Sequence, residues 1–210
     1  EMEFNRLLSS AISAYGEPNL ENTKIKPELN FNQKKINKKE YYLIKDPKDI
    51  DDWIREAEEV GEVALDTETS SLDPHLADLI GVSLSTKIGK ACYIPIGHNS
   101  KKSINKELVL KKLKPLLEDP SIKKIGQNIK FDFIVLFKHG INISSMEDTM
   151  LMSYVLDAGK NRHNMDTLSE IHLNHKTIAY KDLVGTGKKE INFSEVDIEK
   201  AKDYAAEDAD

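Results

Sequence analysis

The chain has 210 residues, with a hydrophobic fraction of 39%, a charged fraction of 31% and a formal net charge of −6 at pH 7. These values are typical of one globular domain with a tail, and they exclude two large domains and a disordered chain. No apolar run is long enough for a transmembrane helix, and the negative charge argues against a nucleic-acid binder with a broad basic face. The single cysteine, Cys92, lies in an apolar run and is expected to be an inert buried thiol.

The first forty residues differ in composition from the rest of the chain. Residues 1–15 are compatible with a short helix, whereas residues 16–40 contain two prolines, several asparagines and a basic run over 34–39. This composition is typical of a linker, in which the basic run is a flexible, solvated segment. The folded part is therefore expected to start near Tyr41.

An antiparallel meander is predicted for the first half of the folded part. A capped amphipathic helix over 48–59 precedes it. The inward residues of this helix are Ile50, Trp53, Ile54 and Ala57. Three short apolar runs then predict strands, and Gly89 marks the turn between the last two. These strands span residues 62–67, 79–85 and 91–96.

Helices dominate the second half, with one buried strand among them. The strand is predicted at 122–125 and is followed by Gly126. The helices are predicted at 106–117, 130–139, 147–156, 165–173 and 195–210. Strands followed by helices favour an α/β domain with a mixed sheet covered by helices.

Two acidic residues follow the apolar run of the first meander strand. In an extended strand, side chains two positions apart point to the same side, so Asp66 and Glu68 project together. Hard divalent cations such as Mg²⁺ and Mn²⁺ prefer oxygen ligands, which makes this pair a candidate metal site. Taken alone, an Asp-x-Glu triplet is better explained as a polar strand end that faces water.

A third acid, Asp132, lies in the strongly apolar stretch from Phe131 to Phe137. A carboxylate among apolar neighbours is costly unless it is paired or metal-bound, which makes Asp132 a candidate ligand. Asn128, four positions earlier, shares its face if a helix begins there, and an N-cap role is a sufficient structural reason for this asparagine.

The last group lies near the end of the chain. Tyr204 and Asp208 are four apart in a helical pattern and therefore share one face, with small residues between them that allow close packing. The neighbouring acids Asp203, Glu207 and Asp210 are expected to be scattered surface charges.

These three segments resemble the motifs of the DEDD exonucleases, in the subclass with tyrosine in the third motif. They are Asp66-x-Glu68, Asn128-x-x-x-Asp132 and Tyr204-x-x-x-Asp208, in this order along the chain. Further segments, at 66–73, 125–128, 148–150, 162–168, 175–178 and 204–210, resemble the 3′→5′ proofreading domain of bacterial DNA polymerase I, family A. The resemblance implies a ribonuclease-H-like α/β fold, in which a mixed sheet (an antiparallel meander plus parallel strands) is flanked by helices.

The resemblance covers residues 41–210, which it implies are an exonuclease domain truncated before a polymerase domain. Residues 1–40 are then an N-terminal tail and linker at the end of a preceding 5′-nuclease region. The implied partners are a single-stranded DNA 3′ end and the polymerase domain of the same full-length chain, with no membrane. The implied location is the bacterial cytoplasm, in association with the nucleoid.

The implied reaction is hydrolysis of nucleotides from DNA 3′ ends, with two Mg²⁺ or Mn²⁺ ions as cofactors. In the family pattern Asp66 binds both metals, Glu68 and Asp208 complete the one that holds the attacking water, and Asp132 serves the second. Tyr204 is expected to orient that water, since an unperturbed phenol has a pKa of about 10 and is a poor base at neutral pH. Four bare carboxylates would repel one another, which agrees with metal binding.

Contacts to the DNA strand are also implied by the resemblance. Leu72 matches an apolar wedge against the terminal bases, and Tyr180 matches an aromatic position that stacks on a base. Without the resemblance, both residues would be interpreted as ordinary core. The remaining candidate contacts are Thr69, Gln127, Asn128 and Arg162.

Two alternatives stay open. One is an RNA 3′-end exonuclease of the ribonuclease D type, and the other is a catalytically silent domain that only braces a polymerase. The polymerase-like segments argue against the first alternative. The presence of all four carboxylates together with Tyr204 argues against the second.

Overall fold

The computed structural model describes residues 5–16, 40–100 and 102–210. The chain divides into two units, residues 1–34 and 35–210. In the described part of the first unit, α1 (Asn5–Tyr15) confirms the helix predicted at the start of the chain. Residues 17–39, which include most of the predicted linker and its basic run, lie outside the described residues.

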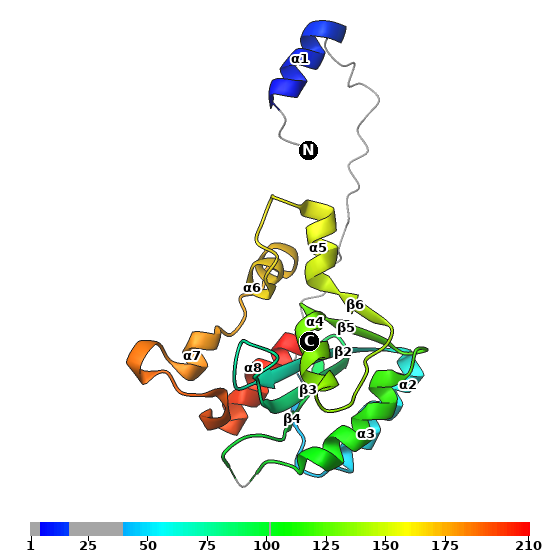
Figure 1. Cartoon of the computed structure of the whole chain (residues 1–210), viewed down its shortest axis with the longest axis vertical. Coiled ribbons are helices and arrows are strands. Elements are labelled where there is room, and N and C mark those ends of the chain that lie inside the picture. Colours follow the sequence, from blue (N-terminus) through cyan, green and yellow to red (C-terminus); the bar gives the residue numbers. More distant parts are fainter. Residues whose placement is uncertain (1–4, 17–39, 101) are drawn as a thin grey trace. The chain divides into compact units, whose positions relative to one another are not determined.

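The second unit is built on a six-stranded mixed sheet with the strand order β1-β4-β3-β2-β5-β6 (Figure 1). The strands are β1 (Glu40–Leu43), β2 (Glu62–Thr69), β3 (Leu79–Lys87), β4 (Lys90–Pro95), β5 (Lys123–Gly126) and β6 (Met146–Asp148). The β2-β3-β4 meander is antiparallel, whereas β1, β5 and β6 each pair in parallel with a neighbouring strand. The predicted meander and the predicted mixed sheet are both confirmed.

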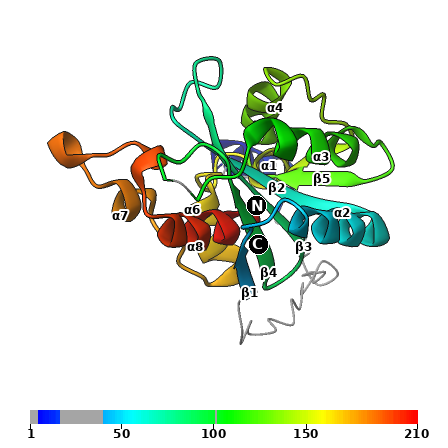
Figure 2. The ribbon, with the colours of Figure 1, turned by 90° about the horizontal axis from the view of Figure 1, so that it is seen from below.

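Helices cover both faces of this sheet (Figure 2). They are α2 (Asp49–Val60), α3 (Lys106–Glu118), α4 (Ile129–Phe137), α5 (Thr149–Asp157), α6 (Met165–Leu168), α7 (Tyr180–Val184) and α8 (Ile198–Ala209). Side chains that alternate along β4 pack against different helices on the two faces of the sheet. Cys92 and Ile94 join the core beneath α2 and α3, whereas Tyr93 between them packs with α8.

Helix α8 approaches the sheet closely because its inner surface carries small side chains. Ala201, Ala205 and Ala206 are fully buried, and the last two are the small residues between Tyr204 and Asp208 for which close packing is predicted. The helix begins after Asp197, whose carboxylate accepts hydrogen bonds from two backbone N–H groups of the first turn. This packing brings the Tyr204 and Asp208 face next to β2.

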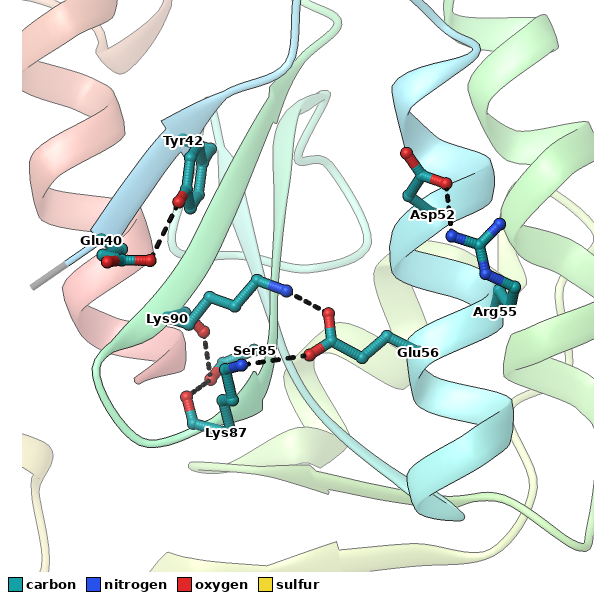
Figure 3. A network of polar contacts seen from close by, with 8 residues as sticks. All are labelled: Glu40, Tyr42, Asp52, Arg55, Glu56, Ser85, Lys87 and Lys90. Carbon is teal, nitrogen blue, oxygen red and sulfur yellow. Dashed lines mark hydrogen bonds and ion pairs between the residues drawn. The ribbon is translucent and has the colours of Figure 1, made fainter.

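On the opposite face, a polar network joins α2 to the β3-β4 hairpin (Figure 3). The Glu56 carboxylate forms ion pairs with Lys90 and, at 3.8 Å, with Lys87. The Lys90 ammonium also lies 4.7 Å from the centre of the Trp53 ring. The hydrogen bond from Lys90 is the main reason that the pKa of Glu56 is lowered, so α2 is held on the sheet by both charge and apolar packing.

Two predicted helices are wrong in part. The segment predicted as a helix over 147–156 begins as strand β6, and α5 starts only after Asp148. The segment predicted over 165–173 divides into α6 and a π-helical turn, Ser169–Leu173. A three-residue strand and a change of helical pitch are both too short to alter an apolar periodicity.

Three further differences concern short elements. The predicted helix over 195–210 starts at Ile198, after a 3₁₀ turn at Phe193–Glu195. Neither β1 nor α7 is predicted, because four and five residues show too little of a period. Elsewhere the predicted strands and helices are confirmed to within a few residues at their ends.

Two expectations from composition can also be compared with the structure. Among the described residues, no helix has both the length and the apolar character needed to cross a membrane. Cys92 is fully buried on β4, and burial raises the pKa of its thiol, as expected for an inert cysteine.

Candidate active site

The alternation of side chains along β2 decides which acidic residues meet. Asp66 and Glu68 point from β2 toward α8, on the same side as predicted. Thr67, between them, points to the opposite side, where its hydroxyl reaches α4. One strand therefore supplies polar groups to both faces of the sheet.

Three carboxylates converge between β2 and α8. Ligand oxygens of Asp66, Glu68 and Asp208 all lie within 4.8 Å of one another, although Asp208 is far away in the sequence. Glu68 is 7% exposed, and the other two side chains are half-buried. Such a set of oxygen donors is suited to a hard divalent cation.

Asp132 lies beside this group rather than within it. It is 3% exposed on α4, and its carboxylate accepts hydrogen bonds from the Thr67 N–H at 2.9 Å and the Thr67 hydroxyl at 2.5 Å. Its negative charge nevertheless helps to raise the pKa of Glu68, so it is close enough to act on the cluster. Asp132 thus borders the three converging carboxylates.

Burial raises the pKa of all four carboxylates, and repulsion by neighbouring carboxylates adds to the shift of Glu68, Asp132 and Asp208. Burial is the largest cause in each case, and it raises the pKa of Asp66 to about 6 and, together with the charge of Asp66, that of Asp208 to about 8. The pKa values of Glu68 and Asp132 are likewise well above their usual range. The charge of Asp66 contributes to the shift of each of the other three, and Glu68 is affected by all three of its neighbours, so the four carboxylates form one interacting group.

One buried oxygen supports the interpretation of this cluster as a cation site. Glu68 Oε1 is buried and has no hydrogen-bond partner among the residues that the structure describes. A buried carboxylate oxygen without a donor is costly, and a bound cation would satisfy it. The residues present therefore fit a divalent metal ion.

Tyr204 lies one helical turn before Asp208, and the interaction between the two side chains contributes to the pKa shifts of both groups. Burial, followed by the charges of Asp208 and Glu68, raises the pKa of the Tyr204 phenol far above its ordinary value. Its ring centre lies 6.2 Å from that of Phe193 and 6.1 Å from that of Tyr180. The phenol therefore keeps its proton at neutral pH, and its ring is held by two aromatic neighbours.

The side chains of Leu72 and Tyr180 are not ordinary core. Leu72 is 91% exposed on the loop between β2 and β3, and Tyr180 is 43% exposed at the start of α7. Thr69 is half-buried at the end of β2, where its hydroxyl donates to the Ser71 carbonyl at 2.9 Å, and Arg162 is exposed. Of these four residues, Leu72, Tyr180 and Arg162 are exposed and therefore accessible to a ligand.

Gln127 and Asn128 form contacts within the protein. The Gln127 side chain donates to the His163 carbonyl at 2.7 Å and accepts from the Thr149 hydroxyl at 2.6 Å. The Asn128 N–H donates to Asp148 at 3.0 Å. Together these bonds join the loop between β5 and α4 to the start of α5.

The predicted capping role of the Asn128 side chain is wrong. Asn128 does precede α4, but its φ of 59° is left-handed and its side chain makes no capping hydrogen bond. Asparagine tolerates this conformation better than most residues, which is the local reason for its presence here.

The expectation of scattered surface acids is wrong for one of the three residues, Glu207. Asp203 is exposed and pairs with Lys202 at 2.9 Å, as expected. The Glu207 side chain is 8% exposed and accepts from the Ile178 N–H at 2.6 Å. Asp210 is exposed as expected, and it accepts from the Gly89 N–H, also at 2.6 Å. No local sequence pattern distinguishes these acids, since their partners are remote in the chain.

Comparison with known sequences gives a consistent result. A family model described as 3′-5′ exonuclease matches residues 41–210. DNA polymerase I of Rhizobium leguminosarum is 44% identical over 191 residues, and that of Pseudomonas aeruginosa is 42% identical over 177 residues. Each alignment covers 81% of this chain but only 19% of the relative, so the chain spans about a fifth of the length of these curated relatives.

Two solved structures illustrate the similarity of fold. Brucella melitensis NrnC is 27% identical, with a TM-score of 0.60 over 81% of this chain and 75% of that one. Escherichia coli RNase D, an exoribonuclease involved in structured RNA processing, is 18% identical, with a TM-score of 0.59 over 80% of this chain and 41% of that one. The second likeness concerns the fold alone, and both agree with the predicted ribonuclease-H-like architecture.

Proposed function

Because this chain belongs to the 3′→5′ exonuclease family of DNA polymerase I, we propose that it hydrolyses nucleotides from the 3′ ends of single-stranded DNA as a proofreading activity. The observation that carries the proposal is the convergence of Asp66, Glu68 and Asp208, next to the buried Asp132. A buried acidic cluster with an unpartnered oxygen is expensive to maintain and is expected only where a cation is used.

In this proposal Asp66, Glu68 and Asp208 hold divalent cations, either Mg²⁺ or Mn²⁺, and Asp132 contributes from the side of α4. Two such ions neutralise the carboxylates when bound and stabilise the charge that develops on the attacking and leaving oxygens of the phosphodiester. Asp66 is the best candidate for the shared ligand, because its charge acts on each of the other three carboxylates.

Tyr204 is proposed to orient the attacking water. Its phenol stays protonated, so without changing its charge it can donate its single O–H to Asp208 or to a water oxygen, and it can accept from a water O–H. A group with such a raised pKa is unsuited to remove a proton at neutral pH.

We further propose that Leu72, Tyr180 and Arg162 contact the DNA strand, with Thr69, Gln127 and Asn128 as supporting contacts. An exposed leucine and an exposed aromatic ring can pack against bases whatever their sequence, which suits the removal of any misinserted nucleotide. Gln127 and Asn128 are proposed to act mainly by shaping the loop between β5 and α4, since their contacts lie within the protein.

The wider setting of the domain is also a proposal. Residues 41–210 are proposed as the exonuclease domain of a DNA polymerase I, in which residues 1–40 end a preceding 5′-nuclease region and a polymerase domain is the main partner. The protein would then act in replication and repair in the bacterial cytoplasm, at the nucleoid.

A nuclease assay on matched substrates tests the proposed function. We expect the chain to shorten a single-stranded DNA stepwise from its 3′ end with Mg²⁺ or Mn²⁺, and to be inactive in EDTA. RNA of the same sequence should be degraded more slowly. Faster degradation of RNA would favour the ribonuclease D alternative, and inactivity on both substrates with either metal would favour a silent domain.

Replacing Tyr204 by phenylalanine should slow excision by about tenfold to a hundredfold, the value of one or two hydrogen bonds to the reacting groups. Phenylalanine keeps the ring contacts with Phe193 and Tyr180, so the melting temperature should change little. Single-turnover excision and thermal unfolding measure the two effects. Tyr42→Phe, which removes a hydroxyl bonded to Glu40, is the matched control and should retain the full rate.

A further inference from the structure

The segment that carries Tyr180 extends away from the sheet. Residues 174–185, which include α7 and are called the α7 arm below, lie beyond α8 in both views of the ribbon (Figures 1 and 2). Within the arm's own surroundings, Thr177 donates to Asp166 at 2.6 Å and Ser169 donates to the His175 carbonyl at 3.0 Å. These bonds join the arm to the α6 segment, while Val184 at the end of α7 is buried in the core cluster that contains Ile80 and Tyr93. The start of the arm, before Tyr180, is bound to α8.

Glu207 of α8 binds the arm at two points. Its Oε2 accepts from the Ile178 N–H at 2.6 Å, and its Oε1 lies 2.9 Å from His175 Nε2. The Glu207 side chain is 8% exposed and that of His175 is 39% exposed, so the carboxylate is largely shielded from water although the imidazole that it meets is partly open to it. Because one carboxylate holds two groups that are three residues apart, it fixes the orientation of the arm as well as its distance from α8.

The arm in turn places an aromatic ring against Tyr204. Tyr180 follows Ile178 by two residues, and its ring stacks on Phe193 with a centre distance of 6.2 Å and an interplanar angle of 7°. The same ring meets that of Tyr204 edge-on at 6.1 Å. A change in the arm would therefore move both Tyr180 and the packing that holds Tyr204.

We propose that Glu207 is a positioning residue for the exonuclease reaction, which holds the α7 arm so that Tyr180 is presented to the DNA strand and Tyr204 is held beside Asp208. The proposal rests on the proposed function, and it assigns to Glu207 no contact with the reacting atoms. In this role Glu207, which lies beside the proposed metal ligand Asp208, positions Tyr180, the proposed DNA contact on the α7 arm.

Two substitutions at Glu207 distinguish its hydrogen bonds to the arm from the effect of its negative charge. Glu207→Ala removes both bonds to the arm. Glu207→Gln removes the charge but can keep both bonds, because the amide oxygen accepts from the Ile178 N–H and the amide nitrogen donates to His175 Nε2 in its Nδ1–H tautomer. Asp203→Ala, which removes an exposed acid from the same helix, is the matched control.

Amide hydrogen exchange of the metal-free chain tests the arm without any activity. We expect Glu207→Ala to accelerate exchange at Ile178 and along the α7 arm by about tenfold, the value of one lost buried hydrogen bond, while exchange in β2 and β3 stays unchanged. Glu207→Gln and Asp203→Ala should exchange at the wild-type rate. If Glu207→Ala does not fold, His175→Ala removes one of the two bonds from the arm side and should accelerate exchange at Ile178.

Kinetics on a 3′-labelled single-stranded DNA complete the test. We expect Glu207→Ala to raise KM by about tenfold with a smaller change in kcat, and Glu207→Gln to restore the wild-type KM. The proposal is overturned if exchange in the arm is unchanged in Glu207→Ala, or if Glu207→Gln is as impaired as the alanine variant. An inactive wild-type chain would instead count against the proposed function, and the exchange experiment would still decide the role of Glu207.

Discussion

Replacing Asp66 by alanine is expected to reduce the rate of 3′ nucleotide release by at least about a thousandfold, which corresponds to about 4 kcal/mol of lost transition-state stabilisation. The reason is that Asp66 interacts with each of the other three carboxylates of the cluster. Its charge contributes to the raised pKa of Glu68, Asp132 and Asp208. If Asp66 is a metal ligand as proposed, its removal takes away an oxygen from the centre of the donor set.

Single-turnover excision of a 3′-labelled oligonucleotide, with saturating Mg²⁺ or Mn²⁺, measures this effect. Loss of folding is not expected to explain the result, because removing one of several repelling buried carboxylates relieves repulsion in the metal-free protein. Asp203→Ala, which removes an exposed acid from α8, should retain the wild-type rate. Equal rates for wild type and Asp66→Ala would contradict the assignment of Asp66 as a metal ligand.

The parts of this site that can be predicted from sequence are those set by local periodicity. Asp66 and Glu68 share a side because they are two apart in a strand, and Tyr204 and Asp208 share a face because they are four apart in a helix. The antiparallel meander is predicted for the same reason, since each of its strands is long enough to show an apolar run.

What local periodicity cannot give is the pairing of remote segments. The approach of α8 to β2 depends on the whole sheet, so nothing near Asp208 indicates that it meets Asp66. Asp132 can be recognised in the sequence as an acid among apolar residues. Its hydrogen bonds with Thr67 cannot, because they depend on which face of the sheet α4 covers. Glu207 escapes detection because both of its partners lie on the α7 arm.

The left-handed conformation of Asn128 is a further example. Its sequence context indicates a helix start, which is correct, and a capping side chain, which is wrong. The backbone turns sharply there because the Asn128 N–H is drawn to Asp148, a residue that also caps α5. Because the Asp148 side chain binds two segments that are remote in the sequence, the local pattern of neither segment predicts this contact.

The metal-free protein is expected to lose stability as the pH rises from about 4 to about 8, because burial raises the pKa values of four carboxylates. They are Asp66, Glu68, Asp132 and Asp208. In the unfolded chain these carboxyl groups titrate near their usual values of about 4, whereas in the folded chain the pKa is about 6 for Asp66 and about 8 for Asp208. Between these values the folded state binds more protons than the unfolded state, so the free energy of unfolding falls with rising pH. Each pKa unit corresponds to about 1.4 kcal/mol, and the loss should amount to a few kcal/mol.

A bound cation should reverse this trend. Mg²⁺ or Mn²⁺ binds the ionised carboxylates of the folded chain, so its stabilising effect should be small at about pH 5 and large at about pH 8. Urea unfolding in EDTA and in excess metal, across this range, measures the free energy of unfolding under both conditions. A metal effect that does not grow with pH would count against a cation site at these carboxylates.

Other groups also titrate in this range, so the cluster must be isolated by difference. Burial lowers the pKa of His98, and a group held neutral in this way makes the folded state more stable as the pH rises, which is opposite in sign to the carboxylates. Asp66→Ala leaves His98 in place but removes the central charge of the cluster. Its free energy of unfolding in EDTA should therefore fall less with pH than that of the wild type, and the metal effect should largely vanish. If the free energy of unfolding depends on pH in the same way in both proteins, the raised pKa values of these carboxylates are contradicted.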